Sequence, residues 1–146
     1  RDYFEEWFEG AQRRRELADG ARQKGYLKEA VFDLHQATER LYHCIFLVRT
    51  LYSPKTHNLN RLRALTEQLE PQLRSVWPTD SKFEKRAYNL LREAYIKARY
   101  SREYVISPEE LDWLAERVAL LQDLVRELCT ARIAELEAAL SSSHMS

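Results

Sequence analysis

Apolar residues recur along this chain at the three- and four-residue spacing of amphipathic helices, in five separate stretches. These stretches cover residues 2–24, 26–52, 59–69, 81 to between 100 and 104, and 107–140. Only three glycines and four prolines occur, so the turn chemistry that many short strands require is scarce. With no strand pattern and no internal repeat, the sequence predicts an all-α helical bundle.

Helix boundaries are marked by punctuating residues. Ser81 followed by Glu84 is the pattern of a capping box, and it predicts the start of the fourth helix. The pair Ser107–Pro108 predicts the start of the fifth, because serine caps a helix and proline suits its first turn. Between the third and fourth helices, residues 70–80 contain two prolines, and we expect an irregular connection there.

The second stretch is the most apolar, and its apolar residues fall on two opposite sides. The main face carries Ala30, Leu34, Ala37, Leu41, Cys44, Ile45 and Val48. The opposite face carries Phe32, His35, Glu39, His43 and Phe46. A helix that is apolar on two sides needs two packing partners, and a second subunit is one source of the second partner.

The last stretch begins as a short heptad seam and then changes register. The seam consists of Leu111, Leu114, Val118, Leu121, Val125 and Leu128. It shifts at Cys129, so we expect the final turns to face a different surface or to stand free. The end of the chain, SSSHMS at residues 141–146, has low complexity and predicts a flexible tail, and we exclude its His144 and Met145 from functional reasoning. The expected single domain therefore spans residues 1–140.

Charge and cysteine content narrow the class of protein. The 23 basic and 23 acidic residues give a net charge of zero, which argues against a domain that binds nucleic acid by bulk charge but allows a local basic patch. Cys44 and Cys129 lie within apolar periodic segments, which predicts buried free thiols and a reducing cytoplasm. No stretch approaches the roughly 18 apolar residues of a membrane span. The chain starts at Arg1 with helical patterning at once, and we expect it to lack an N-terminal portion.

His35, Glu39 and His43 lie four residues apart on one stripe of the second helix. Such a set can bind a metal, serve acid–base chemistry or line a polar seam between helices. The HExxH, Glu-x-x-His and Cys-x-x-Cys patterns of metal sites are absent, and so are nucleophile elbows and phosphate-binding glycine loops. We therefore expect a polar contact between helices or subunits, with no metal and no cofactor.

The end of the fourth helix is richer in binding chemistry. Residues 94–104, AYIKARYSREY, interleave three tyrosines with Lys97, Arg99 and Arg102. Aromatic faces can stack on a nucleobase while the cations hold phosphates. The same residues can instead pack at the end of the bundle and cap helix carbonyls, and the sequence leaves both interpretations open.

Two segments taken together resemble a known family. They are HQATERLYHCIFLVRTLYSPKTHNLNRL at residues 35–62 and EKRAYNLLREAYIKARYSREYVISPEEL at residues 84–111. The HQA-x-E helix, the PKTH-N/D-L connection and the A-Y-x-x-A-R-Y helix end occur in the order typical of the HEPN domain. The resemblance covers nearly the whole chain before the tail. The Tyr-rich form most resembles the C-terminal half of bacterial proteins in which a nucleotidyltransferase precedes the HEPN domain.

The resemblance implies an antiparallel, up-and-down bundle of four long helices plus a short one, as a cytoplasmic homodimer with a cleft at the subunit contact. It implies a nucleotidyltransferase as partner, in the same chain or in an adjacent protein, and a nucleotide as possible ligand. The candidate nucleotide-binding residues are Lys97, Arg99, Tyr100, Arg102, Tyr104, His35, Glu39, Lys55 and His57. For His57, a role in fixing its loop and a place in the cleft both remain open.

Some HEPN domains are ribonucleases, and these carry the motif Arg-x(4–6)-His. No arginine stands at that spacing before His35, His43 or His57; Arg49 lies eight residues before His57. We therefore expect a non-catalytic domain that dimerises and binds nucleotide or assists an adjoining nucleotidyltransferase. A ribonuclease with a divergent site and a purely structural oligomerisation module are the alternatives.

Overall fold

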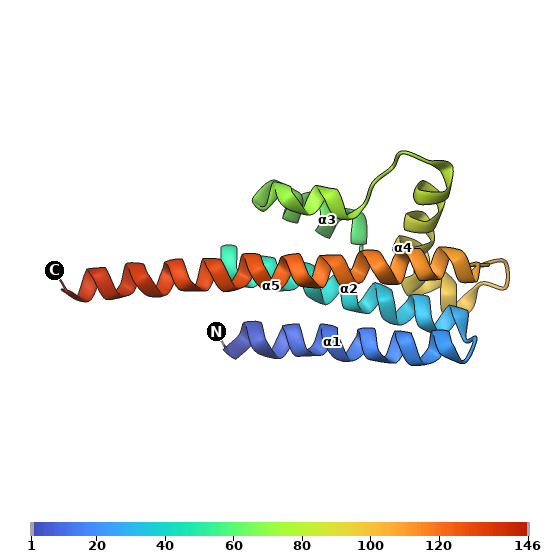
Figure 1. Ribbon diagram of the computed structural model, residues 1–146, viewed down its shortest axis with the longest axis horizontal. Coiled ribbons are helices and arrows are strands. Elements are labelled where there is room, and N and C mark those ends of the chain that lie inside the picture. Colours follow the sequence, from blue (N-terminus) through green and yellow to red (C-terminus); the bar gives the residue numbers. More distant parts are fainter. Residues whose placement is uncertain (1, 146) are drawn as a thin grey trace.

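The computed structural model describes residues 2–145, and every regular element among them is helical (Figure 1). The elements are α1 (Asp2–Gln23), α2 (Leu27–Arg49), α3 (Leu59–Leu69), the 3₁₀-helix η1 (Pro71–Val76), α4 (Lys82–Tyr100) and α5 (Pro108–Met145). α1 runs antiparallel to both α2 and α5 (Figure 1). The all-α prediction is confirmed. Both predicted helix starts are confirmed. Ser81 and Glu84 form a reciprocal capping box at the start of α4, and the Ser107 hydroxyl accepts from the Glu110 amide at the start of α5.

The connection between α3 and α4 is more regular than the sequence predicts. Residues 71–76 form the 3₁₀-helix η1, with Pro71 in its first turn, where a missing amide donor costs nothing. Leu73 and Val76 are fully buried, so the segment is held by core packing. Trp77, at the end of η1, donates from Nε1 to the Tyr42 hydroxyl at 2.8 Å and lies against the Tyr88 ring.

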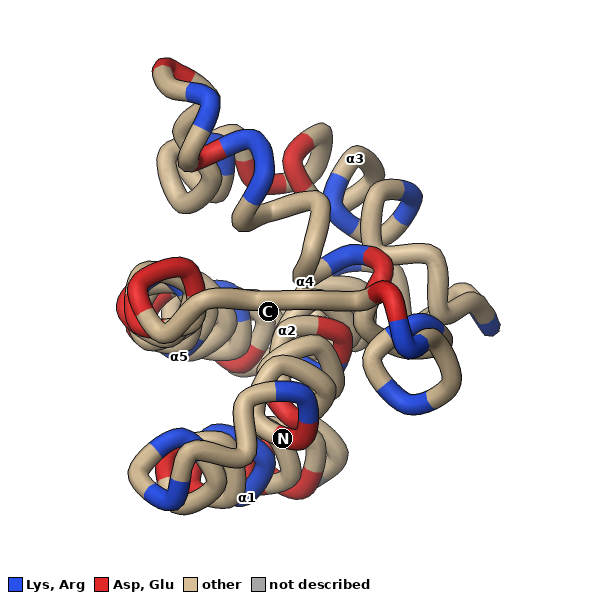
Figure 2. The backbone as a smooth tube through the Cα atoms, turned by 90° about the vertical axis from the view of Figure 1, so that its right-hand side faces the viewer, with Lys and Arg blue, Asp and Glu red and all other residues tan. Residues whose placement is uncertain are grey.

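α2 is the central helix of the bundle and contacts α1, α3, α4 and α5 (Figure 2). Its main apolar face is buried as expected, and burying a side chain such as Leu34 or Leu41 contributes about 1.5–3 kcal/mol each. The opposite face is also covered by this same chain. Trp7 of α1 lies against His43, and Tyr95 of α4 lies against His35. The second packing partner of α2 therefore does not require a second subunit.

The turn between α1 and α2 is set by Gly25. Its φ of +79° is accessible to glycine at little cost. The Gly25 amide donates to the Arg22 carbonyl and the Tyr26 amide to the Ala21 carbonyl, which is a Schellman motif ending α1. This turn places Tyr26 directly at the start of α2.

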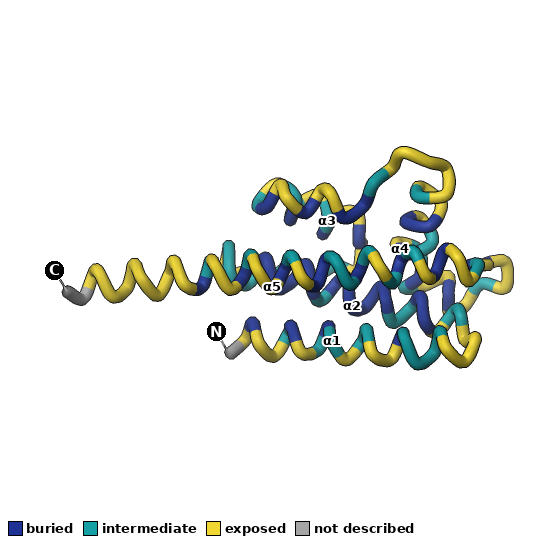
Figure 3. Tube along the Cα trace, viewed as in Figure 1, coloured by how far each residue is buried: buried dark blue, intermediate teal, exposed yellow. Residues whose placement is uncertain are grey.

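α5 follows its predicted seam and then leaves the bundle. The side chains from Leu111 to Val125 on the seam are fully buried, Cys129 takes over from the half-buried Leu128, and burial ends at Ile133. Beyond this point the helix projects past the other elements, with Leu140 62% exposed (Figure 3). The predicted flexible tail falls on the last turns of this helix as far as Met145, and its flexibility stays a prediction.

Both cysteines are free and buried, as the sequence predicts. Within residues 2–145, no helix combines the length and the apolar character that a membrane crossing needs.

The hydrogen bond between Trp77 and Tyr42 gives a test of the fold. Tyr42→Phe leaves the buried Trp77 N–H without an acceptor, and we expect it to lower the free energy of unfolding by about 1–3 kcal/mol. Urea denaturation monitored by circular dichroism measures the change. Tyr100→Phe, which removes a hydroxyl from an exposed ring, is the matched control and should leave stability unchanged. Equal stability of the two variants would contradict the packing described here.

Candidate functional site

A buried carboxylate on α2 anchors the site. The Glu39 side chain is almost fully buried, and its Oε1 accepts a hydrogen bond from His57 Nδ1 at 2.7 Å. Its other oxygen accepts from Gln36 Nε2 at 3.4 Å. Because an ionised carboxylate only accepts, this contact favours a proton on His57 Nδ1, and in the neutral ring that tautomer leaves Nε2 as an acceptor. The His57 side chain is 55% exposed, so the ring is accessible to solvent.

The connection that carries His57 is locally ordered. Pro54 is buried, and Leu59 at the start of α3 is 1% exposed, so both ends of the segment are anchored. Asn58 caps α3 by accepting from the Arg61 amide at 3.2 Å, and the Asn58 amide donates to Thr56 Oγ1 at 3.1 Å. These contacts hold His57 in place over α2.

Aromatic rings from two helices and this connection form a column beside Glu39. The His57 ring stacks on Tyr95 with centroids 4.1 Å apart and planes inclined by 11°. Tyr95 in turn stacks with Phe32 of α2 at 6.1 Å. The column places an α4 ring between an α2 ring and the histidine.

Arg99 of α4 lies over this column. Its guanidinium carbon is 4.5 Å from the centroid of Phe32, 5.2 Å from Tyr95 and 5.1 Å from Tyr100. Nε and Nη2 donate to the Tyr95 carbonyl, which fixes the side chain against the helix end. Among the side chains of residues 3–143, which the structure describes, none forms an ion pair with Arg99, so no carboxylate there neutralises its charge. Aromatic faces and an unpaired guanidinium together suit a planar or anionic ligand.

His35 lies against the column, with its ring centroid 5.7 Å from that of Tyr95. It is fully buried, and neither ring nitrogen has a hydrogen-bond partner; its Nδ1 is 3.8 Å from Glu39 Oε2. Burial, aided by the charge of the nearby His57 and partly opposed by the His57 backbone, lowers the pKa of His35 from 6.5 to about 4. Burial also raises the pKa of Glu39, and the hydrogen bond from His57 opposes that rise. His35 is therefore neutral at physiological pH.

The predicted His35–Glu39–His43 stripe separates in the structure. His43 hydrogen-bonds through Nδ1 to the Ser53 hydroxyl and lies against Trp7, on a different side from the Tyr95 column. Burial lowers the pKa of His43 as well. The polar seam predicted for α2 is thus an internal contact of this chain. Within the described range, no three His, Cys, Asp or Glu side chains are arranged to hold a metal ion.

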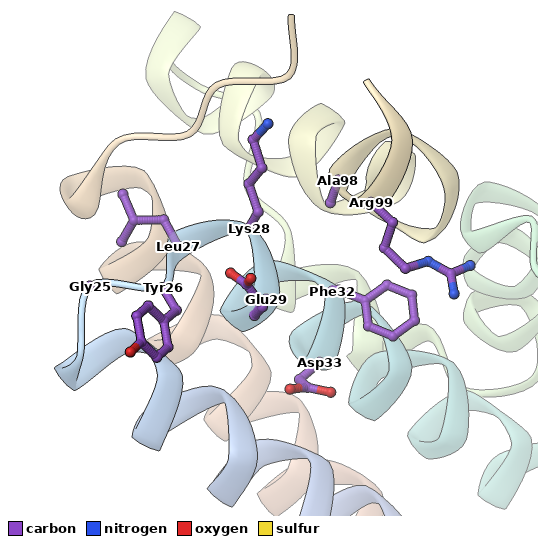
Figure 4. A pocket seen from close by; sticks show the side chains of 9 residues that line it. All are labelled: Gly25, Tyr26, Leu27, Lys28, Glu29, Phe32, Asp33, Ala98 and Arg99. Atoms are coloured by element: carbon purple, nitrogen blue, oxygen red, sulfur yellow. The ribbon is translucent and has the colours of Figure 1, made fainter. Parts of the chain in front are cut away.

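A cavity of about 720 Å³ opens between the start of α2 and the end of α4 (Figure 4). We call it the Arg99 pocket. Its lining residues are Gly25, Tyr26, Leu27, Lys28, Glu29, Phe32, Asp33, Ala98 and Arg99. A second cavity of about 550 Å³ has Tyr95, His57 and Lys97 in its lining. Phe32, at one end of the aromatic column, lines the first cavity, whereas Tyr95 and His57 line the second.

The other predicted site residues are distributed differently. Lys97 borders the second cavity, where it pairs with Glu93 at 3.1 Å. Tyr100 is 74% exposed beside Arg99, whereas Tyr104 is buried and donates its hydroxyl to the Leu90 carbonyl at 2.5 Å. The structure therefore brings Arg99 and Tyr100 near the His35, Glu39 and His57 group, and places Tyr104 in the core. Lys55 and Arg102 are exposed on the connections that follow α2 and α4.

The sequence places Tyr95 in the aromatic and basic stretch of residues 94–104 and Phe32 on the second face of its helix, but neither is among the nine candidate nucleotide-binding residues. Tyr95 stands four residues before Arg99, and this spacing places both on one helix face. Phe32 shares the α2 stripe with His35. The sequence signal for both is their spacing, because each aromatic residue lies one helical turn from a candidate site residue: Tyr95 from Arg99, and Phe32 from His35.

Comparison with known protein families identifies the class of this protein. Residues 4–128 match the HEPN domain family, which covers most of the chain, and the chain belongs to that family. No curated protein matches the chain at a significant level of sequence similarity.

The low pKa of His35 predicts an acid-dependent loss of stability. The unfolded chain binds a proton at His35 below about pH 6.5, whereas the folded chain binds it only near pH 4. Folding stability linked to His35 is therefore complete above pH 6.5 and falls as the pH drops toward 4, by an amount on the order of 3 kcal/mol. His35→Leu should remove this part of the pH dependence. Urea unfolding of both proteins at pH 7 and pH 4.5 measures it, and equal losses in both proteins would contradict the assignment.

Proposed function

We propose that this HEPN domain binds a nucleotide in the Arg99 pocket and serves as a non-catalytic module for a nucleotidyltransferase. The observation that carries the proposal is the Arg99 guanidinium, which lies over aromatic rings, bears no ion pair and borders a cavity of about 720 Å³. A phosphate is the natural partner of such a guanidinium, since it accepts two parallel N–H bonds. Exposed rings nearby supply stacking surface for a base.

Two further parts of the proposal concern assembly. Ile96 and Tyr100 lie one turn apart on α4 and are 62% and 74% exposed, which supports contact with a second copy beside the pocket. A nucleotidyltransferase in the same chain or an adjacent protein would then share the nucleotide held at Arg99. The resemblance of the Tyr-rich α4 end to nucleotidyltransferase–HEPN proteins supports this partner.

Removing the guanidinium tests the proposal. We expect Arg99→Ala to weaken ATP and GTP binding roughly tenfold to a hundredfold, because a charge-assisted hydrogen bond to phosphate is lost. The affinity of Arg99→Lys should lie between those of the unmodified domain and Arg99→Ala, since lysine keeps the charge but lacks the planar guanidinium. Isothermal titration calorimetry measures the affinity, and light scattering in the same buffer measures the oligomeric mass.

Arg74→Ala is the matched control, because Arg74 is an exposed arginine on η1, outside the residues that line the Arg99 pocket. It should bind nucleotide like the unmodified domain. If Arg99→Ala binds as tightly as this control, the Arg99 pocket is not the site. If the unmodified domain binds no nucleotide and is a stable dimer, the function is that of a structural oligomerisation module.

The Glu39–His57 pair supports a second candidate function, cleavage of RNA. A buried carboxylate that orients a histidine and leaves its Nε2 open is an arrangement suited to general base catalysis. His57 Nε2 would take the proton of a ribose 2′-hydroxyl as its oxygen attacks phosphorus. The bond from phosphorus to the 5′-oxygen breaks, the leaving oxygen receives the proton, and a 2′,3′-cyclic phosphate remains.

This second function predicts metal-independent cleavage of single-stranded RNA that is lost in His57→Ala and reduced in Glu39→Gln. Gel electrophoresis of a labelled RNA in the presence of EDTA measures the products. The control Arg74→Ala, purified in the same way, should cleave normally. An intact RNA with the unmodified domain, or equal cleavage by His57→Ala, would rule this function out.

A further inference from the structure

Glu29 is an acidic residue in the lining of the Arg99 pocket, and the proposed function gives it no role. It lies in the first turn of α2, is exposed, and makes no side-chain hydrogen bond or ion pair with the residues from 3 to 143, whose side chains the structure describes. Asp33, one turn further along the same helix, is held instead by Arg14 at 2.9 Å. The Glu29 carboxylate is therefore free to accept hydrogen bonds from a ligand.

Glu29 lies between two aromatic side chains. Tyr26, Glu29 and Phe32 follow each other at a spacing of three, so each lies roughly 60° further round the helix axis than the last. All three line the Arg99 pocket, where they form a slanting stripe over roughly 9 Å. Figure 4 shows the carboxylate between the two rings.

Tyr26 is an unusual residue for its place in the helix. It occupies the N-cap of α2, where Ser, Thr, Asp or Asn is preferred, and its side chain makes no capping hydrogen bond. The residue is also 56% exposed. Neither capping nor core packing accounts for the ring, which leaves a flat surface free at this end of the pocket.

The cationic groups lie toward α4. Arg99 stands over Phe32 at one end of the stripe, and Lys28 donates from Nζ to the Ser101 carbonyl at the end of α4. The pocket thus combines a stacking surface at Tyr26, an acceptor at Glu29 and an unpaired guanidinium at Arg99. A ligand that matches this order carries a flat ring, adjacent hydrogen-bond donors on that ring, and an anionic group.

We propose that the pocket takes a guanine nucleotide, with the Glu29 carboxylate accepting from N1–H and from the 2-amino group of the base. Guanine presents these two donors side by side, and an ionised carboxylate offers two acceptor oxygens and no donor. Adenine presents an acceptor at N1 next to its amino group, so the same carboxylate would meet a lone pair. The inference rests on the proposed function and adds the identity of the base.

The alternative role of Glu29 is electrostatic. An acidic residue in the first turn interacts favourably with the positive end of the helix dipole. That role stabilises the helix whichever nucleotide is present, so it predicts no discrimination between bases.

Titration calorimetry with GTP, ITP and ATP separates the two roles. ITP keeps N1–H but lacks the 2-amino group, so it loses one of the two bonds to Glu29. We expect the unmodified domain to bind GTP at least about tenfold more tightly than ATP, with ITP between them. Glu29→Gln should abolish this preference, because an amide can also donate to adenine N1.

Glu16→Gln, on an exposed position of α1, is the matched control and should keep the preference for GTP. Equal affinity of the unmodified domain for GTP and ATP would overturn the guanine inference and leave the proposed function standing. An unchanged preference in Glu29→Gln would overturn the role of Glu29. Absence of binding to all three nucleotides by a folded domain would overturn the proposed function and this inference with it.

Discussion

The structure depends on the burial of the middle of α2, where almost every residue from 34 to 46 is buried. Four neighbouring elements cover this helix, yet it carries Glu39, His35 and His43 at buried positions. Buried polar groups must find partners within the protein or change their charge state. Glu39 obtains its partner from the connection after α2, and His43 obtains one from the same connection. His35 has none and stays neutral. The path of residues 53–58 is thus fixed by the polar groups it must satisfy.

The surface that results has two chemically different parts, joined by Tyr95. On one side, His57 is oriented by Glu39 and presents an open nitrogen beside the second cavity. On the other side, Arg99 lies over aromatic rings at the border of a larger cavity. The first part suits proton transfer and the second suits an anion. This separation is why nucleotide binding and RNA cleavage are distinct functions that can be tested independently at one place in the fold.

Local signals in the sequence predict the helices well, because caps, prolines and apolar spacing act within a few residues. The same local signals mark Arg99, Glu39 and His57 as site candidates. They do not predict that Glu39 and His57 are in contact, because these two residues are 18 positions apart and their contact depends on the path of the loop between them. The same limit explains why the sequence predicts an irregular connection at residues 70–80, where η1 forms because its apolar side chains reach the core. It also explains why the sequence leaves open whether α2 is covered by its own chain. Tyr104 shows that a tyrosine beside basic residues can equally be a core residue.

The central claim is that the start of α2 and the end of α4 form a nucleotide site. Titration of GTP into the ¹⁵N-labelled domain, followed by amide chemical shifts, tests this most directly. The account predicts saturable shifts clustered in residues 25–33 and 98–99, the two segments that line the Arg99 pocket. An unchanged spectrum, or shifts confined to η1 or to the exposed end of α5, would contradict it.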